Sequence, residues 1–365
     1  MYQDHYISDK ELKKYRPREI RLPLDNNIRA HLLYKEQSQN FSWLKKNLKI
    51  LKNQQTKELN LECVQIRLML NPTRKNSIKA DTFKNKHTEK CVLCNLPPDQ
   101  RGFPILENQY FIIPNPGITI PGDLTISATE HKTQEISGNF LNILETAREL
   151  YDYSVYYNGP LAGASCPHLH FQAGREKKLP GENQIFSLLQ GENIGPELIE
   201  IQTLQATRLF RISDFLRECY LIVGPDKKNI SKIFKHFIQN LKAINENFKP
   251  GQNVQKFGEY IPALDKKEDE PRINIMANWV KEEERYIIAI FPKRTNRPKI
   301  FYDEDNKIML GMGVKESLGN LIIFRQQDFK RLKKDTSQII QAYEDTSILK
   351  RQSEELAESF TKSVL

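Results

Sequence analysis

The stretch YNGPLAGASCPHLHFQ, residues 157–172, joins a loop rich in glycine and proline to a short segment of alternating polar and apolar residues. Successive side chains of a β-strand point to opposite faces, so His168, His170 and Gln172 share one face of the expected strand. The two intervening apolar residues point the other way, into apolar packing. Two imidazoles and an amide beside a small-residue loop that can approach phosphate closely indicate chemistry at phosphorus.

His170 is the candidate nucleophile in this arrangement. A neutral imidazole is a good nucleophile and a fair leaving group near pH 7, as a covalent nucleotidyl intermediate requires. Gln172 lies one step further along the same face, where its amide can hydrogen-bond a non-bridging phosphoryl oxygen. Ser165 and the backbone N–H groups around Gly163 and Ala164 can hold the outgoing phosphate. For an isolated H-x-H pair, the alternative is two histidines with satisfied hydrogen bonds inside a β-core.

A second candidate site begins at Cys91 and Cys94, whose C-x-x-C spacing is a common half of a tetrahedral zinc site. The chain has five cysteines and seven histidines but no second C-x-x-C pair, so histidines have to supply the other ligands. His131 and His168 lie at the ends of expected strands. They are therefore the simplest choice for the two ligands that would complete the site with the two thiolates. The alternatives are a redox pair, or two buried cysteines that act as small hydrophobic residues beside an unrelated His131.

The composition indicates a globular protein with a large core. The chain has 365 residues, 39% of them hydrophobic, and its 55 basic and 46 acidic residues give a formal net charge of +9. This charge suits anionic ligands, but it is spread over the whole chain, so nucleic-acid binding is allowed rather than indicated. The polar amino terminus, the lack of a long apolar run and the odd number of cysteines predict a cytoplasmic protein without a membrane partner.

Other nucleotide-binding and hydrolase motifs are absent from the sequence. It contains no Walker A motif, no G-x-G-x-x-G after an expected strand, no H-E-x-x-H and no G-x-S-x-G. Lys293 and Arg297, in a basic loop, either line a phosphate pocket or are solvated, and Glu316 either accepts sugar hydroxyl groups or is a surface carboxylate. Cys166 has no candidate base except His168, which argues against a cysteine hydrolase.

Hydrophobic periodicity and turn residues predict the order of the elements. In the first part of the chain we expect a helix over 27–59, strands over 63–70, 110–116, 122–127 and 153–157, and a helix over 139–151. After a crossover over 175–195 we expect strands over 199–205, 219–223, 273–280, 286–291 and 320–324, and a helix over 229–245. Residues 122–127 resemble residues 319–324, and each follows an apolar strand that ends in proline, which indicates two related α+β halves.

Together these motifs resemble those of the histidine-triad superfamily. Residues 158–172 are similar to its H-x-H-x-Q signature, most of all in the branch of galactose-1-phosphate uridylyltransferase, GDP-hexose phosphorylases and diadenosine tetraphosphate phosphorylases. The uridylyltransferase has a similar G-x-S-x-P-H-x-H-x-Q segment, also preceded by C-x-x-C and by a histidine after a strand. The likeness covers residues 62–175 and is looser over 181–345. The order Asn-Pro-x-Arg, C-x-x-C and H-x-H-x-Q also resembles an uncharacterised bacterial family.

The resemblance implies a role for each matching residue of the phosphate-binding segment. It makes His170 the nucleophile and Gln172 its partner at the α-phosphate. It places Ser165 and Asn158 against the phosphates or the active-site loop. The residue between the two histidines is Leu169, whereas the uridylyltransferase has proline at this position. In this respect the segment is closer to the GDP-hexose phosphorylases.

The resemblance also implies roles for more distant residues. Arg74, at the end of Asn-Pro-Thr-Arg, falls at a strand end that meets phosphate, Asn115 falls at a ribose-contacting position, and Glu316 falls at a hexose-binding position. The zinc ligands implied by the resemblance are Cys91, Cys94, His131 and His168. The GDP-hexose phosphorylases do not share these four metal ligands as a characteristic feature. The resemblance therefore implies the mechanism but does not identify the substrate.

We therefore expect an α+β enzyme of two related histidine-triad-like halves, each an antiparallel sheet with helices packed on it. The expected divisions are an arm and helix over 1–61, a catalytic half with structural zinc over 62–180, a second half with the substrate pocket over 181–345, and a helical tail over 346–365. The expected function is a nucleotidyltransferase that takes the nucleotidyl group of a nucleoside diphosphate hexose onto His170.

The expected acceptor of the nucleotidyl group is phosphate or a sugar 1-phosphate, and a homodimer is left open. One alternative is a diadenosine tetraphosphate phosphorylase, which shares the intermediate and has a different leaving group. The other alternative is a non-catalytic, zinc-stabilised protein that binds nucleotides or RNA. The net charge of +9 is its only support, so a nucleic-acid partner is not favoured.

Overall fold

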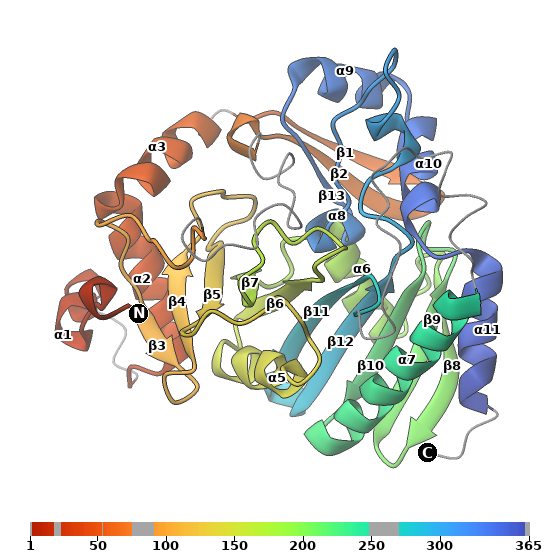
Figure 1. The fold of residues 1–365 in the computed structure, drawn as a ribbon, viewed down its shortest axis with the longest axis horizontal. Helices are drawn as coiled ribbons and strands as arrows, with labels where there is room; N and C mark the ends of the chain where they lie inside the picture. Colours follow the sequence, from red (N-terminus) through yellow and green to blue (C-terminus); the bar gives the residue numbers. More distant parts are fainter. Residues whose placement is uncertain (1, 18–22, 53, 75–90, 248–269, 362–365) are drawn as a thin grey trace.

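In the computed structural model, a ten-stranded antiparallel sheet runs through the molecule, and a smaller sheet and several helices pack on it (Figure 1). The structure describes residues 2–17, 23–52, 54–74, 91–247 and 270–361. The architecture is α+β, which confirms the predicted fold class. Among the described helices, none has the length and apolar character needed to cross a lipid bilayer.

The large sheet consists of two halves with the same strand order. The first half has the order β3-β4-β5-β7-β6 and the second half has the order β8-β9-β10-β12-β11. The strands of the first half are β3 (Phe103–Ile105), β4 (Tyr110–Pro114), β5 (Leu124–Ala128), β6 (Tyr153–Asn158) and β7 (His170–Arg175). Those of the second half are β8 (Glu197–Leu204), β9 (Thr207–Ser213), β10 (Cys219–Gly224), β11 (Ile273–Val280) and β12 (Arg285–Pro292).

The two halves join edge to edge, because β6 pairs antiparallel with β11. Each half places one helix between its third and fourth strands, α5 (Phe140–Glu149) in the first half and α7 (Lys227–Asn247) in the second. The shared strand order and helix position are consistent with the predicted pair of halves, and their histidine-triad relationship stays a prediction.

Helices cover one face of the large sheet. The core on this face includes residues of α5, α7, α2 (Asn26–Asn40) and α11 (Lys350–Thr361). Strand alternation divides the apolar residues between the faces, so that Ile288 and Ile290 of β12 pack on this side and Ile287 and Ala289 pack on the other. Both faces of β12 are therefore buried.

The small sheet and four further helices cover the opposite face of the large sheet, mainly over its second half. The small sheet has the order β1-β2-β13, with β13 parallel to β2. Its strands are β1 (Thr56–Leu61), β2 (Val64–Leu70) and β13 (Asn320–Ile323). The helices in this part of the chain are α6 (Pro180–Leu189), α8 (Val314–Ser317), α9 (Gln326–Lys334) and α10 (Ser337–Thr346).

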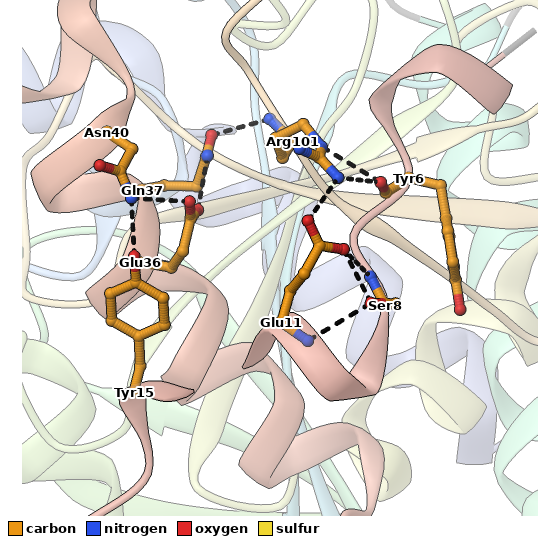
Figure 2. Close-up of polar contacts among 8 residues, drawn as sticks. All are labelled: Tyr6, Ser8, Glu11, Tyr15, Glu36, Gln37, Asn40 and Arg101. Carbon is orange, nitrogen blue, oxygen red and sulfur yellow. Dashed lines mark hydrogen bonds and ion pairs between the residues drawn. The ribbon is translucent and has the colours of Figure 1, made fainter. Parts of the chain in front are cut away.

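The N-terminal segment is fastened to the first half by a polar network around Arg101 (Figure 2). Its guanidinium donates to the carbonyl oxygen of Tyr6 and lies 3.3 Å from a carboxylate oxygen of Glu11. The backbone N–H of Arg101 donates to Gln37 Oε1 at 2.8 Å. Ser8 and Glu11 form a capping box at the start of α1 (Asp9–Leu12), so the segment follows a defined path. The other short elements of this region are η1 (Gln3–His5), η2 (Lys13–Tyr15) and α3 (Ser42–Leu51).

Most predicted strands are confirmed to within a few residues, but two predictions are wrong. The helix expected over 27–59 is two helices, because buried Phe41 adopts an extended conformation between α2 and α3, and β1 begins at Thr56. The expected crossover over 175–195 does connect the two halves, and it also contains the unpredicted helix α6, whose start is favoured by Pro180 at its first position. The stretch 319–324 is not the equivalent of 122–127, since it forms β13 of the small sheet.

Strand β9 was not predicted. The proposed divisions of the chain at residues 61, 180 and 345 stay predictions. Arg208 and Arg211 interrupt the apolar pattern of β9, because both lie on its exposed or half-exposed positions. The small sheet combines strands from both sides of the division at residue 180.

Candidate functional site

A solvent-open cavity lies where the first half of the large sheet meets the loop before α8. Its walls consist of Arg74, Asn158, Gly163, Ala164, Ser165, His170, Gln172, Asn296, Arg297, Gly311, Gly313, Val314, Lys315, Glu316 and Ile322. The structure therefore brings together the predicted catalytic and substrate-binding residues except Asn115 and Lys293.

His170 is the first residue of β7 and lies on the cavity wall. Its Nδ1 atom is 2.8 Å from the carbonyl oxygen of His168, and a carbonyl oxygen can only accept a hydrogen bond. In the neutral ring Nδ1 therefore carries the proton, and Nε2 carries the lone pair. Burial lowers the pKa of His170, which favours this neutral form. Leu169 and Phe171 pack in the core on the other face, as the strand alternation predicts.

Gln134 holds the backbone of the nucleophile and was not predicted. Its Oε1 atom accepts the backbone N–H of His170 at 2.8 Å. Its Nε2 atom donates to the carbonyl oxygens of Asn158 at 2.9 Å and of His170 at 3.2 Å. The side chain is 1% exposed, so these hydrogen bonds are not exchanged for water. No local pattern marks Gln134, since it lies in an irregular polar segment between β5 and α5.

The small-residue loop is held by groups from both halves. Asn158 Oδ1 accepts the backbone N–H of Val314 at 2.8 Å, which ties the end of β6 to the start of α8. In the amide orientation that satisfies its neighbours, Asn274 donates to the carbonyl oxygen of Ala162 at 2.7 Å. Gly163 has a φ of +110°, and a Cβ atom there would lie 3.1 Å from the Cα atom of Gly313. The loop can approach the second half this closely only with glycine at this position.

The cavity has a basic wall. Arg74 ends the 3₁₀ turn η3 (Pro72–Arg74) and donates to the carbonyl oxygen of Gly117 at 3.2 Å. Lys315, which was not predicted, forms a buried ion pair with Asp123, with Nζ 2.6 and 2.8 Å from the two carboxylate oxygens. Burial lowers the pKa of Lys315 although Asp123 opposes this shift. Arg297 lies on the same cavity and packs over the ring of Phe301.

Glu316 gives the cavity one carboxylate. Its Oε2 atom accepts the backbone N–H of Gly313 at 3.0 Å, which caps α8. Burial raises the pKa of Glu316, and the neighbouring Arg74 opposes this shift. The carboxylate therefore shapes the loop before α8 as well as the cavity wall.

Two predicted residues lie behind the cavity instead of on it. Lys293 is buried, and its Nζ atom lies 3.4 Å from Ser317 Oγ. Burial lowers its pKa to about 7, partly opposed by Glu316. Asn115 is also buried, and its Oδ1 atom accepts the backbone N–H of Gly117 at 2.9 Å, in the turn that Arg74 contacts. The direct ligand contacts predicted for both residues stay predictions.

The four predicted metal ligands form one cluster. The ligand atoms of Cys91, Cys94, His131 and His168 all lie within 4.8 Å of one another. The Nδ1 atom of His168 is 3.5 Å from Cys91 Sγ and 3.3 Å from Cys94 Sγ, and His131 Nδ1 is 3.1 Å from Cys94 Sγ. Two thiols and two imidazoles are a donor set suited to a tetrahedral metal ion. These residues can therefore hold a metal ion.

The environment of the cluster fits this role. His168 Nε2 lies 2.9 Å from the carbonyl oxygen of Ala128, which fixes the ring so that Nδ1 faces the two thiols. A hydrogen bond from Cys166 lowers the pKa of Cys91 to about 3, which favours the thiolate. Tyr2 covers this region, since its hydroxyl group donates to the carbonyl oxygen of Leu93 at 2.7 Å. The N-terminal segment is therefore part of the cluster's surroundings.

Comparison with known proteins supports the fold. Residues 33–175 match a family model described as a domain of unknown function, DUF4922. No curated protein matches the chain. The chain is similar in structure to yeast Ap4A phosphorylase Apa2 in complex with AMP, with a TM-score of 0.51, 14% identity, and coverage of 90% of this chain and 98% of Apa2.

The same yeast phosphorylase in complex with Ap4A gives a TM-score of 0.50 and 15% identity, with coverage of 84% of this chain and 97% of that one. Ap4A is diadenosine tetraphosphate, and its phosphorylases are one of the groups that the sequence motifs resemble. At these identities the comparison establishes the shared fold. The predicted closeness to a bacterial family stays a prediction.

Proposed function

We propose that this protein is a nucleotidyltransferase in which His170 attacks the α-phosphorus of a nucleotide that contains a phosphoanhydride bond. The observation that carries the proposal is the position of His170, whose Nδ1 atom is engaged by the His168 carbonyl oxygen while the ring lies on the cavity wall. This arrangement leaves Nε2 as the nitrogen with a lone pair.

The proposed reaction has two displacements at phosphorus. In the first, a bond forms between His170 Nε2 and the α-phosphorus, and the bond from that phosphorus to the bridging oxygen breaks, so that the phosphate-bearing leaving group takes the electron pair. In the second, an oxygen of inorganic phosphate attacks the nucleotidyl group, and its bond to Nε2 breaks. His170 is regenerated, and the sum of both steps is transfer of the nucleotidyl group to phosphate.

The surrounding residues support charge stabilisation in both steps. The loop of Gly163, Ala164 and Ser165 offers backbone N–H groups and a hydroxyl group beside His170, where phosphoryl oxygens would lie. Arg74 and Lys315 add positive charge to the same cavity. Gln172 extends from the same strand face as His170 and is the proposed partner of a non-bridging oxygen.

We propose that the metal ion held by Cys91, Cys94, His131 and His168 is zinc with a structural role. It would supply fixed geometry rather than chemistry, because all four protein ligands close a tetrahedral site. His168 precedes the nucleophile by two residues, so holding its ring in the cluster fixes the entry of β7. We also propose a cytoplasmic location, because a reducing compartment keeps cysteine thiols free to bind a metal ion.

Two classes of substrate compete for the site. A dinucleoside tetraphosphate is favoured by the fold shared with yeast Ap4A phosphorylase Apa2, solved with AMP and with Ap4A. A nucleoside diphosphate hexose is favoured by Glu316, a carboxylate on the cavity wall that can accept hydrogen bonds from sugar hydroxyl groups.

The test is intact-mass detection of a nucleotidylated protein after mixing with Ap4A or with each of several nucleotide sugars, with and without phosphate. We expect a mass gain of one nucleotidyl group with one class, which phosphate then removes, and no gain in His170→Ala. If no substrate modifies the protein while RNA binds with a steep salt dependence, the non-catalytic alternative replaces the proposal.

A further inference from the structure

A third thiol lies against the metal cluster without belonging to it. Cys166 Sγ is 3.6 Å from Cys91 Sγ, and both side chains are buried, with 5% and 3% of their surface exposed. Cys166 is outside the group of four ligands, whose donor atoms are complete without it. The role proposed for the cluster therefore leaves Cys166 unexplained.

The backbone around this pair allows the two sulfur atoms to approach each other. Neither Cys91 nor Cys166 lies in a helix or strand, because Cys91 begins the knuckle before β3 and Cys166 lies in the loop before β7. A disulfide has its sulfur atoms about 2 Å apart, so they would have to move together by roughly 1.5 Å. Apart from the ligand Cys94, the other cysteines are Cys63, exposed beside β1 and β2, and Cys219, buried in β10.

We propose that Cys91 and Cys166 form an oxidation-sensitive pair, in which a peroxide converts the two thiols to a disulfide and thereby dismantles the metal cluster. The Cys91 sulfur attacks one oxygen of hydrogen peroxide, the O–O bond breaks and a sulfenic acid and water form. The Cys166 sulfur then attacks the Cys91 sulfur, the S–O bond breaks and a second water leaves. Two thiols and one peroxide thus give one disulfide and two waters.

A small oxidant can reach the cluster from the surface of the knuckle. Cys94 and His131 are partly exposed, and Val92 between the two knuckle cysteines is 66% exposed. Tyr2 and Leu93 shield the other side, where the tyrosine hydroxyl group donates to the leucine carbonyl oxygen. Peroxide is small enough for this route, whereas bulky thiol reagents are not expected to reach Cys166 in the folded protein.

The disulfide would have two effects. Cys91 can no longer act as a thiolate ligand, so the cluster keeps three donors and its affinity for a metal ion falls. Cys166 follows Ser165 directly, and Ala164 and Ser165 line the cavity, so drawing Cys166 toward the knuckle also displaces the cavity loop. The pair would connect the redox state of the surroundings to both sites.

The test uses the full-length, zinc-loaded protein and hydrogen peroxide. Zinc release is followed with a chromophoric chelator, and the disulfide is identified by mass spectrometry of a non-reducing digest. We expect zinc release together with a peptide linking Cys91 to Cys166, and recovery of zinc binding after dithiothreitol and zinc are added. Cys166→Ala keeps all four ligands, so it is expected to be zinc-loaded before oxidation and to release the zinc about tenfold more slowly under peroxide.

The matched control is Cys63→Ala, which removes an exposed thiol remote from the cluster and is expected to behave like the wild type. The proposal is overturned if Cys166→Ala loses zinc as fast as the wild type, or if the linked peptide joins Cys91 to Cys94. It is also overturned if Cys166→Ala fails to bind zinc before oxidation, because Cys166 would then be a ligand. These readouts rest on the proposed zinc site and do not depend on nucleotidyl transfer, so their failure is distinguishable from failure of the proposed activity.

Discussion

The carbonyl oxygen of His168 accepts a hydrogen bond from His170 Nδ1 at 2.8 Å, while the ring of the same His168 lies among the cysteines of the metal cluster. One residue therefore contributes its side chain to one site and its backbone to the other. A displacement of the His168 ring would move the carbonyl group that sets the tautomer of His170. Integrity of the metal cluster and the nucleophilicity of His170 are expected to change together.

Replacement of the nucleophile gives the first prediction. His170→Ala is expected to lower turnover by roughly four orders of magnitude, because no other histidine among the described residues lies on the cavity wall. Nucleotide affinity, measured by calorimetry, should change by no more than about 1 kcal/mol. His236→Ala on α7 is the control and should keep full activity. Retained turnover in His170→Ala would exclude the nucleotidyl-histidine mechanism.

Loss of the backbone clamp gives the second prediction. Gln134→Ala leaves the buried N–H of His170 without its acceptor, which is expected to lower the free energy of unfolding by about 1–3 kcal/mol. It should also lower kcat more than it raises KM, since the position of the imidazole is loosened. Urea unfolding and steady-state kinetics measure both effects, and Gln326→Ala on the exposed side of α9 is the control. A variant as stable as the control contradicts the role of Gln134.

The buried ion pair of the cavity wall gives the third prediction. Lys315→Met leaves the fully buried carboxylate of Asp123 without its cation and is expected to cost about 3–5 kcal/mol of stability. The double variant Lys315→Met/Asp123→Asn removes both charges and should recover a large part of this loss. Equal stability of the single and double variants in urea unfolding would show that the pair is not coupled.

Metal removal gives the fourth prediction. Treatment with a strong chelator is expected to lower the melting temperature, because binding free energy of a structural metal contributes to folding. Cys94→Ser should show the low melting temperature without chelator and a zinc content near zero by elemental analysis. Cys219→Ser serves as the control with wild-type zinc content, since its side chain lies in β10. Full zinc content in Cys94→Ser would remove this cysteine from the ligand set.

The pH dependence of stability gives the fifth prediction. Burial raises the pKa of Glu270 from 4.5 to about 7, although its carboxylate accepts a hydrogen bond from Tyr157. Between these values the folded state binds more protons than the unfolded state, so this contribution is complete below pH 4.5 and is lost as the pH rises through 7.

Glu270→Gln keeps one of the two oxygens that accept from Tyr157 and from the backbone N–H of Ile136, and it removes the titration. The stability of the wild type relative to this variant should therefore fall as the pH rises from 4.5 to 7, at up to about 1.4 kcal/mol per pH unit. Urea unfolding at a series of pH values measures the difference. Parallel pH profiles for the two proteins would contradict the raised pKa of Glu270.

Local spacing was sufficient to predict the parts of the site that lie on one strand and its loop. The alternation around His168 and His170 predicts which side chains face the core, and the C-x-x-C pair predicts half of the cluster. Such patterns succeed because a strand with period two and a tight knuckle determine relative positions over a few residues.

The residues that were missed depend on long-range register. Gln134, Asn274 and Lys315 act through partners far away in the chain, and no neighbouring residue marks them. The misplaced repeat has the same cause, because the strand 320–323 has the apolar composition of a large-sheet strand and pairs instead with β2. Composition specifies that a strand is buried and does not specify its neighbour.

The seam between β6 and β11 has a consequence for synthesis of the chain. Asn158 pairs with Asn274, so the edge of the first half has no partner until more than a hundred further residues have been translated. At about 5–20 residues per second, this interval lasts roughly 6–23 s. During this time β6 is an unpaired, apolar sheet edge on the nascent chain. A strand of another nascent chain can pair with this edge. Slow translation of residues 176–272 would therefore favour aggregation over folding, and early binding of a chaperone to β6 would oppose it.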